Sequence, residues 1–429
     1  MSEKCESGNK TGSGLTRRSF IRNVGLGAAA VMVAVPGRRV LGANERLGIG
    51  FIGCGGRSSA HQQAVNYLKD KVNLEVVAAC DVYRPRMKRV ADGYSCKGYM
   101  DHRELLDDPN VDVVCIATPD HHHGYQAIDA VKAGKDVYCE KPVTHWRQFD
   151  LTKKLTKTVA ASDSVLQLGT QGMFDSAWWQ MKKLVADGLI GQPVHAECGY
   201  FRVGDWGERG MPIDDPNVKP GADLNWEAFL GDCPKRPFDV SRFFRWRMYE
   251  DYAGGPSTDL FPHSFTPVAS ILGLDMPSMV VATGGKYRYQ DREIPDTFNT
   301  LIDYPQGVTV AVLGTQANNY QGGSGSRGSG GRIPVIRGWD GTLTIQGNEI
   351  VFIPAEGSNK KEQKFAIEHG EDFVGYWQKF IECCRARKRD TLSTMDLAFR
   401  VQTAMQMGMM ALRSGKTATF DVAGERIVI

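Results

Sequence analysis

The sequence predicts an α/β protein in which a domain with a parallel sheet is followed by an α+β domain with an open, largely antiparallel sheet. Short apolar runs alternate with helical patterns from Leu47 to Leu168, which favours parallel strands joined by helical crossovers. Most of these runs are unbroken, as expected for strands that are buried on both faces. After Gly169 the pattern changes to alternating strands flanked by a few helical segments.

The first domain begins with Leu47–Ile52, an apolar run containing β-branched residues that ends in a glycine turn. Leu74–Cys80 is the next run, broken only by Glu75 and ending in Asp81. The remaining expected strands lie near Tyr99 and at 113–117, 136–139 and 165–168, and the expected helices at 59–68, 85–92, 103–106, 125–133 and 152–161. We therefore place one domain at 44–169 and a second at 170–429.

In the second domain we expect helices at 177–186 and 377–385, and strands at 194–201, 279–284, 298–304, 308–316 and 341–345. Residues 321–332 are a low-complexity run of glycine, serine and arginine. The run lacks the Gly-Lys-Ser/Thr ending of a phosphate-binding loop. We expect it to be a mobile loop or an arm that faces another subunit.

Composition excludes several classes of protein. Hydrophobic residues make up 42% of the 429 residues, which excludes general disorder. The chain has 52 basic and 49 acidic residues, and seven basic against two acidic residues lie within 1–43. The body is therefore near neutral and is not expected to bind nucleic acid, which requires a basic face. The ten cysteines include no Cys-x-x-Cys pair, so neither a disulfide framework nor a zinc site is predicted.

Residues 1–43 have the pattern of an export signal. Thr16–Arg22 places twin arginines before an apolar stretch, 24–35, which is too short to cross a bilayer. The segment resembles a twin-arginine (Tat) signal, which implies the Tat export machinery as a partner and a periplasmic location. Cleavage after Ala43 is expected, and an uncleaved signal would be a membrane anchor. The alternative is a chance Arg-Arg pair before a core helix.

The glycine turn after the first strand is typical of a dinucleotide site. Gly53, Gly55 and Gly56 permit a tight turn and close approach of a pyrophosphate to a helix N-terminus. Arg57 follows, and Ser58 replaces the third glycine of the G-x-G-x-x-G pattern. Asp81, at the end of the second strand, is placed to accept hydrogen bonds from the ribose hydroxyls, which favours NAD over NADP. Arg84 nearby counts against that preference, and Asp81 could instead cap a helix.

Three later motifs resemble the glucose–fructose oxidoreductase / inositol dehydrogenase (Gfo/Idh/MocA) family. They are Ala117-Thr-Pro-Asp-His-His-His123, the segment Ala133–Pro142 with its Glu-Lys-Pro ending, and Gly254-Gly-Pro-Ser-Thr-Asp-Leu-Phe-Pro-His263. The resemblance covers about 44–429. It implies an N-terminal Rossmann dinucleotide-binding domain, and a C-terminal α+β domain for substrate binding and oligomerisation. It also implies NAD as cofactor and a homodimer or homotetramer formed through the open sheet.

The resemblance carries the family's catalytic Lys, Asp and His onto Lys141, Asp259 and His263. A cation beside the hydride acceptor stabilises a developing alkoxide, so we assign Lys141 that role and a proton-relay role. His263 is the expected base. Asp259 is the expected orienting carboxylate; at i, i+4 spacing it would share a helix face with His263 while capping that helix.

Two further sets of site residues are predicted. The cofactor set adds Thr118, Pro119, His123, Glu140, Lys141 and Gln171 to the glycine turn and Asp81, with His121–His123 expected in a cofactor-side loop rather than at a metal. Aromatic and planar hydrogen-bonding groups suit a sugar. The substrate set is Lys141, Gln171, Trp178, Tyr200, Arg202, Trp206, Arg245, Trp246, Asp259 and His263.

The sequence therefore predicts an exported NAD(P)-dependent oxidoreductase that retains its cofactor tightly. Its substrate would be a secondary hydroxyl or ketone of a sugar, glycoside or polyol. One alternative is a redox-neutral, NAD-dependent glycosidase or epimerase, although glycosidases resembling this family tend to lack the Glu-Lys-Pro present at Glu140–Pro142. The other alternative is a non-catalytic sugar-binding protein, against which the intact Lys141, Asp259 and His263 speak.

Overall fold

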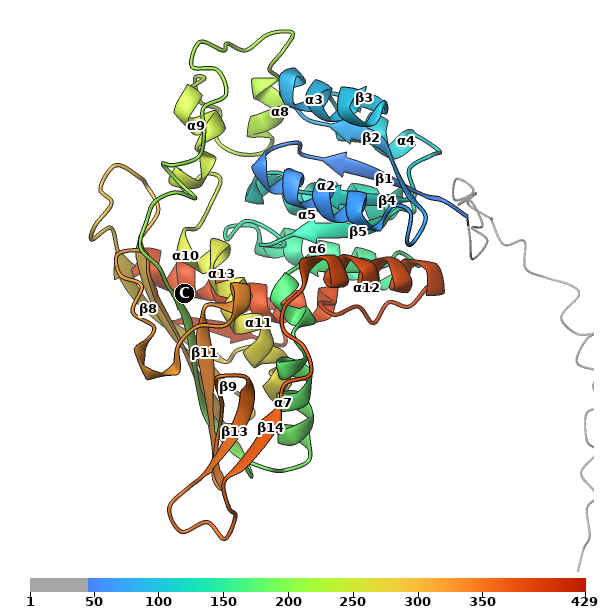
Figure 1. Ribbon diagram of the computed structural model, residues 1–429. Coiled ribbons are helices and arrows are strands. Elements are labelled where there is room, and N and C mark those ends of the chain that lie inside the picture. The colour runs from blue at the N-terminus through green and yellow to red at the C-terminus, as the bar shows by residue number, and fades with distance from the viewer. Residues whose placement is uncertain (1–44) are drawn as a thin grey trace, which may run out of the picture. The chain divides into compact units, whose positions relative to one another are not determined.

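A computed structural model describes residues 45–429, so the predicted export signal lies outside the described residues. The described chain contains two sheets, one of six strands and one of ten (Figure 1). Helices from the C-terminal part of the chain lie between them. Among the described residues, no helix combines the length and apolar character needed to span a bilayer.

The first sheet is parallel throughout, with strand order β3-β2-β1-β4-β5-β6. This confirms the expected parallel sheet, and the order is that of a dinucleotide-binding fold, with its switch point between β1 and β4. The strands are β1 (Leu47–Ile52), β2 (Leu74–Cys80), β3 (Lys97–Tyr99), β4 (Val113–Ile116), β5 (Asp136–Glu140) and β6 (Leu166–Gly169). Ligands of such sheets bind beyond the carboxyl ends of the strands at the switch point.

The helices between these strands are α2 (Gly56–Leu68), α3 (Arg84–Tyr94), α4 (His102–Asp107), α5 (Asp120–Lys132) and α6 (Phe149–Ala160). α5 begins five residues earlier than expected, so His121–His123 lie in its first turn and not in a loop. Pro119 is extended and precedes the helix, whose first residue is Asp120. Contacts of the histidine rings with backbone carbonyls then fix residues whose intrinsic helix propensity is low.

The second sheet has the order β14-β13-β12-β11-β7-β10-β9-β8-β15-β16. Within it, β7 and β10 pair in parallel and the other described pairings are antiparallel, which confirms the predicted α+β class. The strands are β7 (Pro193–Phe201), β8 (Met279–Gly285), β9 (Thr297–Tyr304), β10 (Val308–Thr315), β11 (Arg332–Gly338), β12 (Gly341–Gln346), β13 (Glu349–Pro354), β14 (Gln363–Ala366), β15 (Ala418–Asp421) and β16 (Arg426–Val428).

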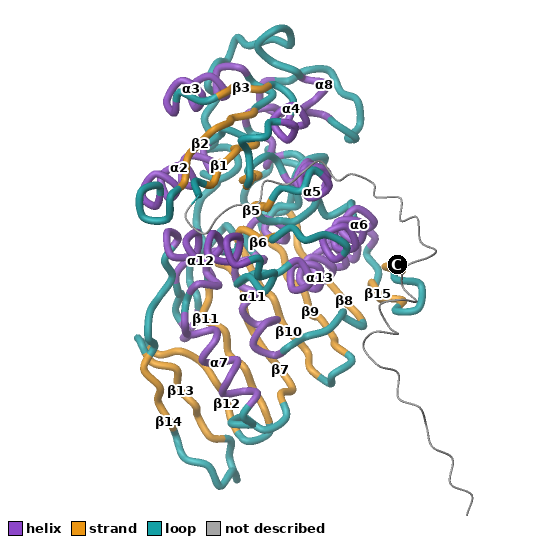
Figure 2. Tube along the Cα trace, turned by 90° about the vertical axis from the view of Figure 1, so that its right-hand side faces the viewer, coloured by secondary structure: helices purple, strands orange, loops and turns teal. Residues whose placement is uncertain are grey.

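Helices cover one face of this sheet (Figure 2). They are the 3₁₀ turn η1 (Gln171–Phe174), α7 (Ser176–Ala186), α11 (Phe261–Leu272), α12 (Phe373–Ala386) and α13 (Met395–Ser414). α12 also contacts α2, and α13 also contacts α6, so both helices join the two sheets. The amide of Gln402 in α13 donates to the carbonyl of Thr144, which follows β5.

A long insertion, residues 202–255, connects β7 to the helices that carry Asp259 and His263. It contains α8 (Trp226–Leu230), α9 (Val240–Phe244) and the 3₁₀ turn η2 (Trp246–Met248), and it is followed by α10 (Pro256–Asp259). Its aromatic side chains form a core cluster with Tyr83 of the first domain. The insertion thus lies beside α3 at the edge of the parallel sheet (Figure 1).

Candidate active site

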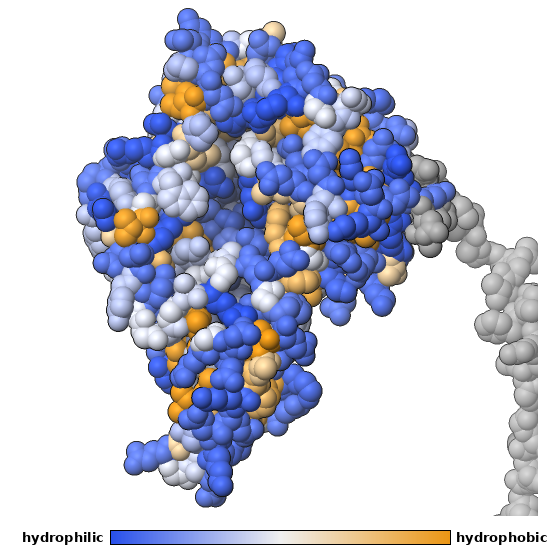
Figure 3. Space-filling model, viewed as in Figure 1, coloured by the Kyte–Doolittle hydropathy of each residue, from blue (hydrophilic) through white to orange (hydrophobic). Residues whose placement is uncertain are grey.

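A cavity of about 950 Å³ lies at the carboxyl ends of β1, β2, β4 and β5. The first domain, the insertion and residues around α10 and α11 all contribute to its lining. Figure 3 shows the corresponding hollow on the face of the molecule that Figure 1 presents. The predicted residues lining this cavity are Gly53, Gly55, Gly56, Arg57, Asp81, Thr118, Pro119, His123, Glu140, Lys141, Gln171, Tyr200, Arg202, Trp206, Trp246, Asp259 and His263.

The glycine turn fits a pyrophosphate. Gly53 has a φ of +89°, and a Cβ there would lie 2.7 Å from the carbonyl oxygen of Ala117. At Gly56 a Cβ would meet nothing within 4 Å, so the backbone is open to a close ligand. α2 begins at Gly56 without a side-chain cap, which leaves backbone N–H groups of its first turn for phosphate oxygens.

Ser58 does not belong to the cavity wall, contrary to its place in the predicted cofactor set. Its side chain is fully buried, and its hydroxyl accepts a hydrogen bond from Gln62 one turn further along α2. The position where the fingerprint has its third glycine thus faces the packed side of the helix. The side chain of Ser58 therefore contributes to packing.

Asp81 is held rigidly at the end of β2. Its two carboxylate oxygens accept backbone hydrogen bonds from Cys54 at 2.8 Å and Tyr83 at 2.9 Å. Burial raises the pKa of the Asp81 carboxyl. The positive charges of nearby arginines and the two backbone hydrogen bonds oppose that rise. Each oxygen keeps a further lone pair, and the carboxylate lines the cavity where a ribose is expected.

Glu140 lines the cavity and is held in place by two neighbouring side chains. It accepts hydrogen bonds from Nε of Arg57 at 2.8 Å and from Nε2 of His61 at 3.0 Å. The indole of Trp377 donates to Nδ1 of His61, which fixes the proton of this ring on Nε2. Burial alone would raise the pKa of Glu140, but Arg57 and His61 hold it well below its usual range. Arg57 also donates to Gln171 at 3.3 Å.

The three consecutive histidines do not converge on a common point. His121 and His122 each place Nε2 against the carbonyl of Phe229 in the insertion, at 2.8 and 2.7 Å. His123 lies between the carbonyls of Pro142 and Thr118, so it ties the ends of β4 and β5 together. Within residues 45–429, no cluster of three His, Cys, Asp or Glu side chains is arranged to hold a metal ion.

Lys141 and Asp259 form a buried ion pair between the domains. The Lys141 ammonium donates to Oδ1 of Asp259 at 2.7 Å and to its carbonyl at 2.6 Å, and the two side chains are 10% and 17% exposed. Nε of Arg247 lies 3.4 Å from the same Oδ1. Burial would raise the pKa of Asp259, but Lys141 and Arg247 keep it far below its usual range.

Asp259 and His263 do not share one helix, which corrects the predicted capping arrangement. Asp259 ends α10, and α11 begins at Phe261 after a break at Leu260. The two side chains still reach the same cavity. Nδ1 of His263 is buried and has no hydrogen-bond partner among the described residues. Burial, and then the charge of Lys141, lowers the pKa of His263 to about 3, so its ring is neutral at pH 7.

Two predicted substrate residues lie outside the cavity. Trp178 is 4% exposed, and its indole donates to the carbonyl of Gly172 within the core. Arg245 donates to the carbonyl of Met211 and stays within the insertion. The prediction missed Arg247, two positions further on, although the neighbouring Asp259 was assigned. Only the fold brings the Arg247 guanidinium to that carboxylate.

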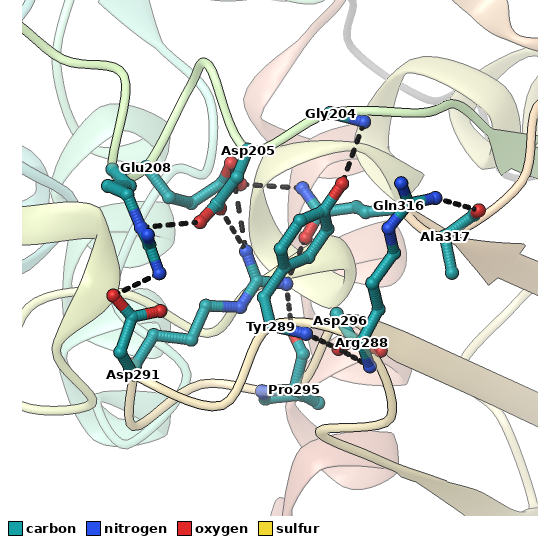
Figure 4. A network of polar contacts seen from close by, with 12 residues as sticks. Gly204, Asp205, Glu208, Arg288, Tyr289, Asp291, Pro295, Asp296, Gln316 and Ala317 are labelled. Atoms are coloured by element: carbon teal, nitrogen blue, oxygen red, sulfur yellow. Dashed lines mark hydrogen bonds and ion pairs between the residues drawn. The ribbon is translucent and has the colours of Figure 1, made fainter.

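A polar network fixes the start of the insertion (Figure 4). Arg202 donates to both carboxylate oxygens of Glu208, at 3.0 and 3.1 Å, and Gln316 donates to Glu208 at 2.6 Å. Asp205 accepts from the buried Arg292 at 2.7 Å. Trp206 is 67% exposed, and Cζ of Arg202 lies 4.6 Å from the centre of its indole ring. The network thus holds one cation and one aromatic face at the cavity.

The glycine-rich run 321–332 is anchored, and Ser329 within it lines the cavity, which contradicts the expected mobile loop. Arg327 donates two hydrogen bonds to Asp175, at 2.5 and 3.0 Å. The backbone N–H of Ser329 donates to Glu371 at 2.5 Å, and Ser329 is part of the cavity wall. Low sequence complexity reflects close backbone approach here: a Cβ on Gly331 would lie 2.6 Å from the ring of Tyr200.

The fold and this cavity define a dinucleotide-binding oxidoreductase, and comparison with known proteins gives its family. Residues 47–170 match the family model described as an oxidoreductase family with an NAD-binding Rossmann fold, and residues 175–429 match the C-terminal alpha/beta domain of the same family. The chain belongs to the Gfo/Idh/MocA family. It is an NAD-dependent oxidoreductase.

Several curated relatives are polyol dehydrogenases by name. The inositol 2-dehydrogenase/D-chiro-inositol 3-dehydrogenase of Lactiplantibacillus plantarum is 33% identical over 162 residues, 36% of this chain and 43% of that protein. This match spans less than half of the relative's length. The scyllo-inositol 2-dehydrogenase (NAD(+)) of Bacillus subtilis is 24% identical over 381 residues, 88% of this chain and 95% of that protein.

Solved structures share the fold. Levoglucosan dehydrogenase in complex with NADH and L-sorbose superposes with a TM-score of 0.65 at 18% identity, covering 87% of this chain and 99% of that one. The WlbA dehydrogenase of Bordetella pertussis, in complex with NADH and UDP-GlcNAcA, gives 0.63 at 17% identity, covering 88% and 99%.

Proposed function

We propose that this chain is an exported dehydrogenase that interconverts a secondary hydroxyl and a ketone of a sugar, glycoside or polyol, using a retained NAD. One observation carries the proposal. The Lys141–Asp259 pair and the side chain of His263 share one cavity with the glycine turn and Asp81. The polyol relatives support the substrate class.

The chemistry follows from three groups. NAD bound in the cavity would supply the hydride acceptor. His263, neutral at pH 7 and part of the cavity wall, takes the proton of the substrate hydroxyl. The Lys141 ammonium stabilises the oxygen as it gains negative charge, in a site where burial strengthens the attraction. Asp259 fixes the position of that ammonium and is left to accept a second substrate hydroxyl.

Contacts of the insertion support tight cofactor retention. The backbone N–H of Arg84 donates to Asp223 at 2.8 Å, and that of Asn225 donates to Val82 at 2.9 Å, so the insertion is fastened directly beyond Asp81. Ala228 and Phe229 extend the same wall to the histidines of α5. We infer that this wall slows release of a bound cofactor. Export of a folded, loaded enzyme by the predicted signal is consistent with such retention.

The test is absorbance at 340 nm on protein purified without added NAD, while inositol isomers, free sugars and glycosides are titrated in. A rise stoichiometric with protein supports both the dehydrogenase and the retained cofactor. If the absorbance rises only after millimolar NAD is added, the retained cofactor is contradicted and the dehydrogenase activity is not. Release of aglycone without any absorbance change would instead indicate the redox-neutral cycle.

The signal and the assembly need separate measurements. The export signal is tested by fusing residues 1–43 to a reporter that is active only when it is exported in the folded state. The double variant Arg17→Lys/Arg18→Lys is the matched control. Scattering-based mass measurement on the mature chain tests the expected homodimer or homotetramer. A monomer would contradict that part of the proposal.

A further inference from the structure

Three arginines follow Asp81 within eight residues, an arrangement that by charge alone would favour a 2′-phosphate and therefore NADP. Of these three arginines, Arg86 is the one that lines the cavity. It lines the cavity together with Asp81, and its Nη1 is 3.4 Å from the Cβ position of Gly55 in the phosphate-binding turn. A guanidinium at this place is suited to phosphate.

The insertion holds Arg86 on two sides. Asp214 accepts from Nε at 2.6 Å and from Nη2 at 3.1 Å, a bidentate pair with side chains 17% and 27% exposed. Phe244 of α9 lies against the guanidinium, with its ring centre 5.1 Å from Cζ. Two of the three guanidinium nitrogens are therefore engaged by Asp214, and the positive charge is compensated.

The other two arginines are also engaged. Arg84 donates two hydrogen bonds to the carbonyl of Ala222, and its Nε lies 3.1 Å from Asp223. Arg89 donates to the carbonyl of Cys54. The charges of Arg84 and Arg86 are thus paired with Asp223 and Asp214, and Arg89 is bonded to the glycine turn, next to the carboxylate of Asp81.

We propose that Asp214 is a specificity-determining residue for the cofactor: by engaging Arg86 it keeps this site selective for NAD over NADP. The residue belongs to the insertion and lies outside the Rossmann domain. Cofactor choice therefore depends on the second domain as well as on Asp81. Removal of the Asp214 carboxylate releases a guanidinium beside the ribose, where it can pair with a 2′-phosphate.

The experiment measures dissociation constants of NAD and NADP by titration calorimetry on nucleotide-stripped full-length protein. For Asp214→Ala we expect the NADP:NAD ratio of dissociation constants to fall at least tenfold, which is about 1.4 kcal/mol. The milder Asp214→Asn should shift the ratio in the same direction. Asp215→Ala is the matched control, because the Asp215 carboxylate accepts from the N–H of Asn217 within the insertion, and it should keep the wild-type ratio.

The double variant Asp214→Ala/Arg86→Gln should restore the wild-type ratio, since the gain requires the arginine. An unchanged ratio in both Asp214 variants would overturn the proposal. So would equal weakening of both nucleotides, because the pair would then only hold the insertion in place. Wild-type protein that binds neither nucleotide would refute the NAD assignment itself, which is a different result from an unchanged ratio.

Discussion

The ammonium of Lys141 donates to both the carboxylate and the backbone carbonyl of Asp259, at 2.7 and 2.6 Å. One side chain follows β5 of the parallel sheet, and the other ends α10 next to the second domain. The pair therefore exists only when the two parts of the fold are assembled. The proposed catalytic centre therefore lies at their junction.

Replacing Lys141 with methionine should lower kcat by about 10²–10³, because one oxyanion-stabilising cation is lost. NAD affinity should change little, since the glycine turn and Asp81 remain. Steady-state kinetics and calorimetry separate the two effects. Lys132→Met, on the exposed side of α5, is the control, and an equal loss of activity there would remove the argument for Lys141.

Replacing His263 with alanine should lower kcat at pH 7 by about 10²–10⁴, the usual contribution of a positioned base. The residual rate should rise with pH, because solvent hydroxide takes over the role of the missing imidazole. His369→Ala is the matched control, since His369 bonds to the carbonyl of Gly370 away from the cavity. A pH-independent residual rate would argue against a base at position 263.

Replacing Asp81 with alanine should weaken NAD binding by about 1.5–3 kcal/mol, the range for hydrogen bonds to a charged group. The backbone N–H groups of Cys54 and Tyr83 also lose their acceptor, so the glycine turn loosens. Asp81→Asn keeps an acceptor and should lose less. Unchanged calorimetric affinity in Asp81→Ala would show that Asp81 only caps the turn.

Replacing Arg327 with alanine should raise the KM for the sugar several-fold and leave NAD affinity intact. The bidentate pair with Asp175 positions Ser329 against the cavity, and without it the glycine-rich run is free to move. Arg288→Ala removes a surface arginine bonded to the carbonyl of Ala317 and serves as control. A fall in kcat at constant KM would contradict a substrate-side role.

Buried His145 should make the fold less stable in acid. Its Nε2 donates to the carbonyl of Glu250, and its Nδ1 accepts from the N–H of Arg147. A neutral imidazole ring can make both hydrogen bonds. Burial, then the charge of Arg147, lowers its pKa to about 3. The unfolded ring takes up a proton below about 6.5, so stability falls as the pH drops from about 6.5 towards 3.

The size of this effect can be measured by urea unfolding at pH 7 and pH 5. His145 alone should account for about 2 kcal/mol of the stability lost between these values, at about 1.4 kcal/mol per pH unit below 6.5. His145→Gln does not titrate, so its loss should be smaller by that amount. Identical losses in the two proteins would show that His145 is protonated in the folded state.

The parallel sheet could be predicted because its strands are short apolar runs, each ending in turn residues, as at Gly53 and Asp81. α13 was not predicted. It is buried on most sides, with Met, Ala, Gln and Thr in the core, so its sequence lacks a polar face and the helical period. Strand β14 near the open edge was missed because it has only four residues and includes Lys364. Strand β13 was missed although Ile350–Ile353 is an unbroken apolar run.

The candidate site was predictable where motif residues follow a strand directly, as Lys141 and Glu140 follow or end β5. Trp178 and Arg245 could not be placed from composition, since aromatic and cationic side chains serve the core as well as a sugar site. Arg247, Ser329 and Asp214 reach the site only through tertiary contacts. The anchoring of the glycine-rich run 321–332 could not be predicted either. A glycine-rich sequence is found both in flexible segments and in segments whose backbone packs closely.

The most direct test of the central claim is the fate of the carbinol hydrogen. Myo-inositol deuterated at its carbon atoms, and then the best substrate of the panel in the same form, is incubated with the enzyme and NAD. Mass spectrometry of the nucleotide should find one deuterium for each ketone formed, and Lys141→Met should keep this ratio while forming both products about 10²–10³ times more slowly. Deuterium appearing in solvent, or retained in a product with no ketone, would contradict a dehydrogenase and favour the redox-neutral cycle.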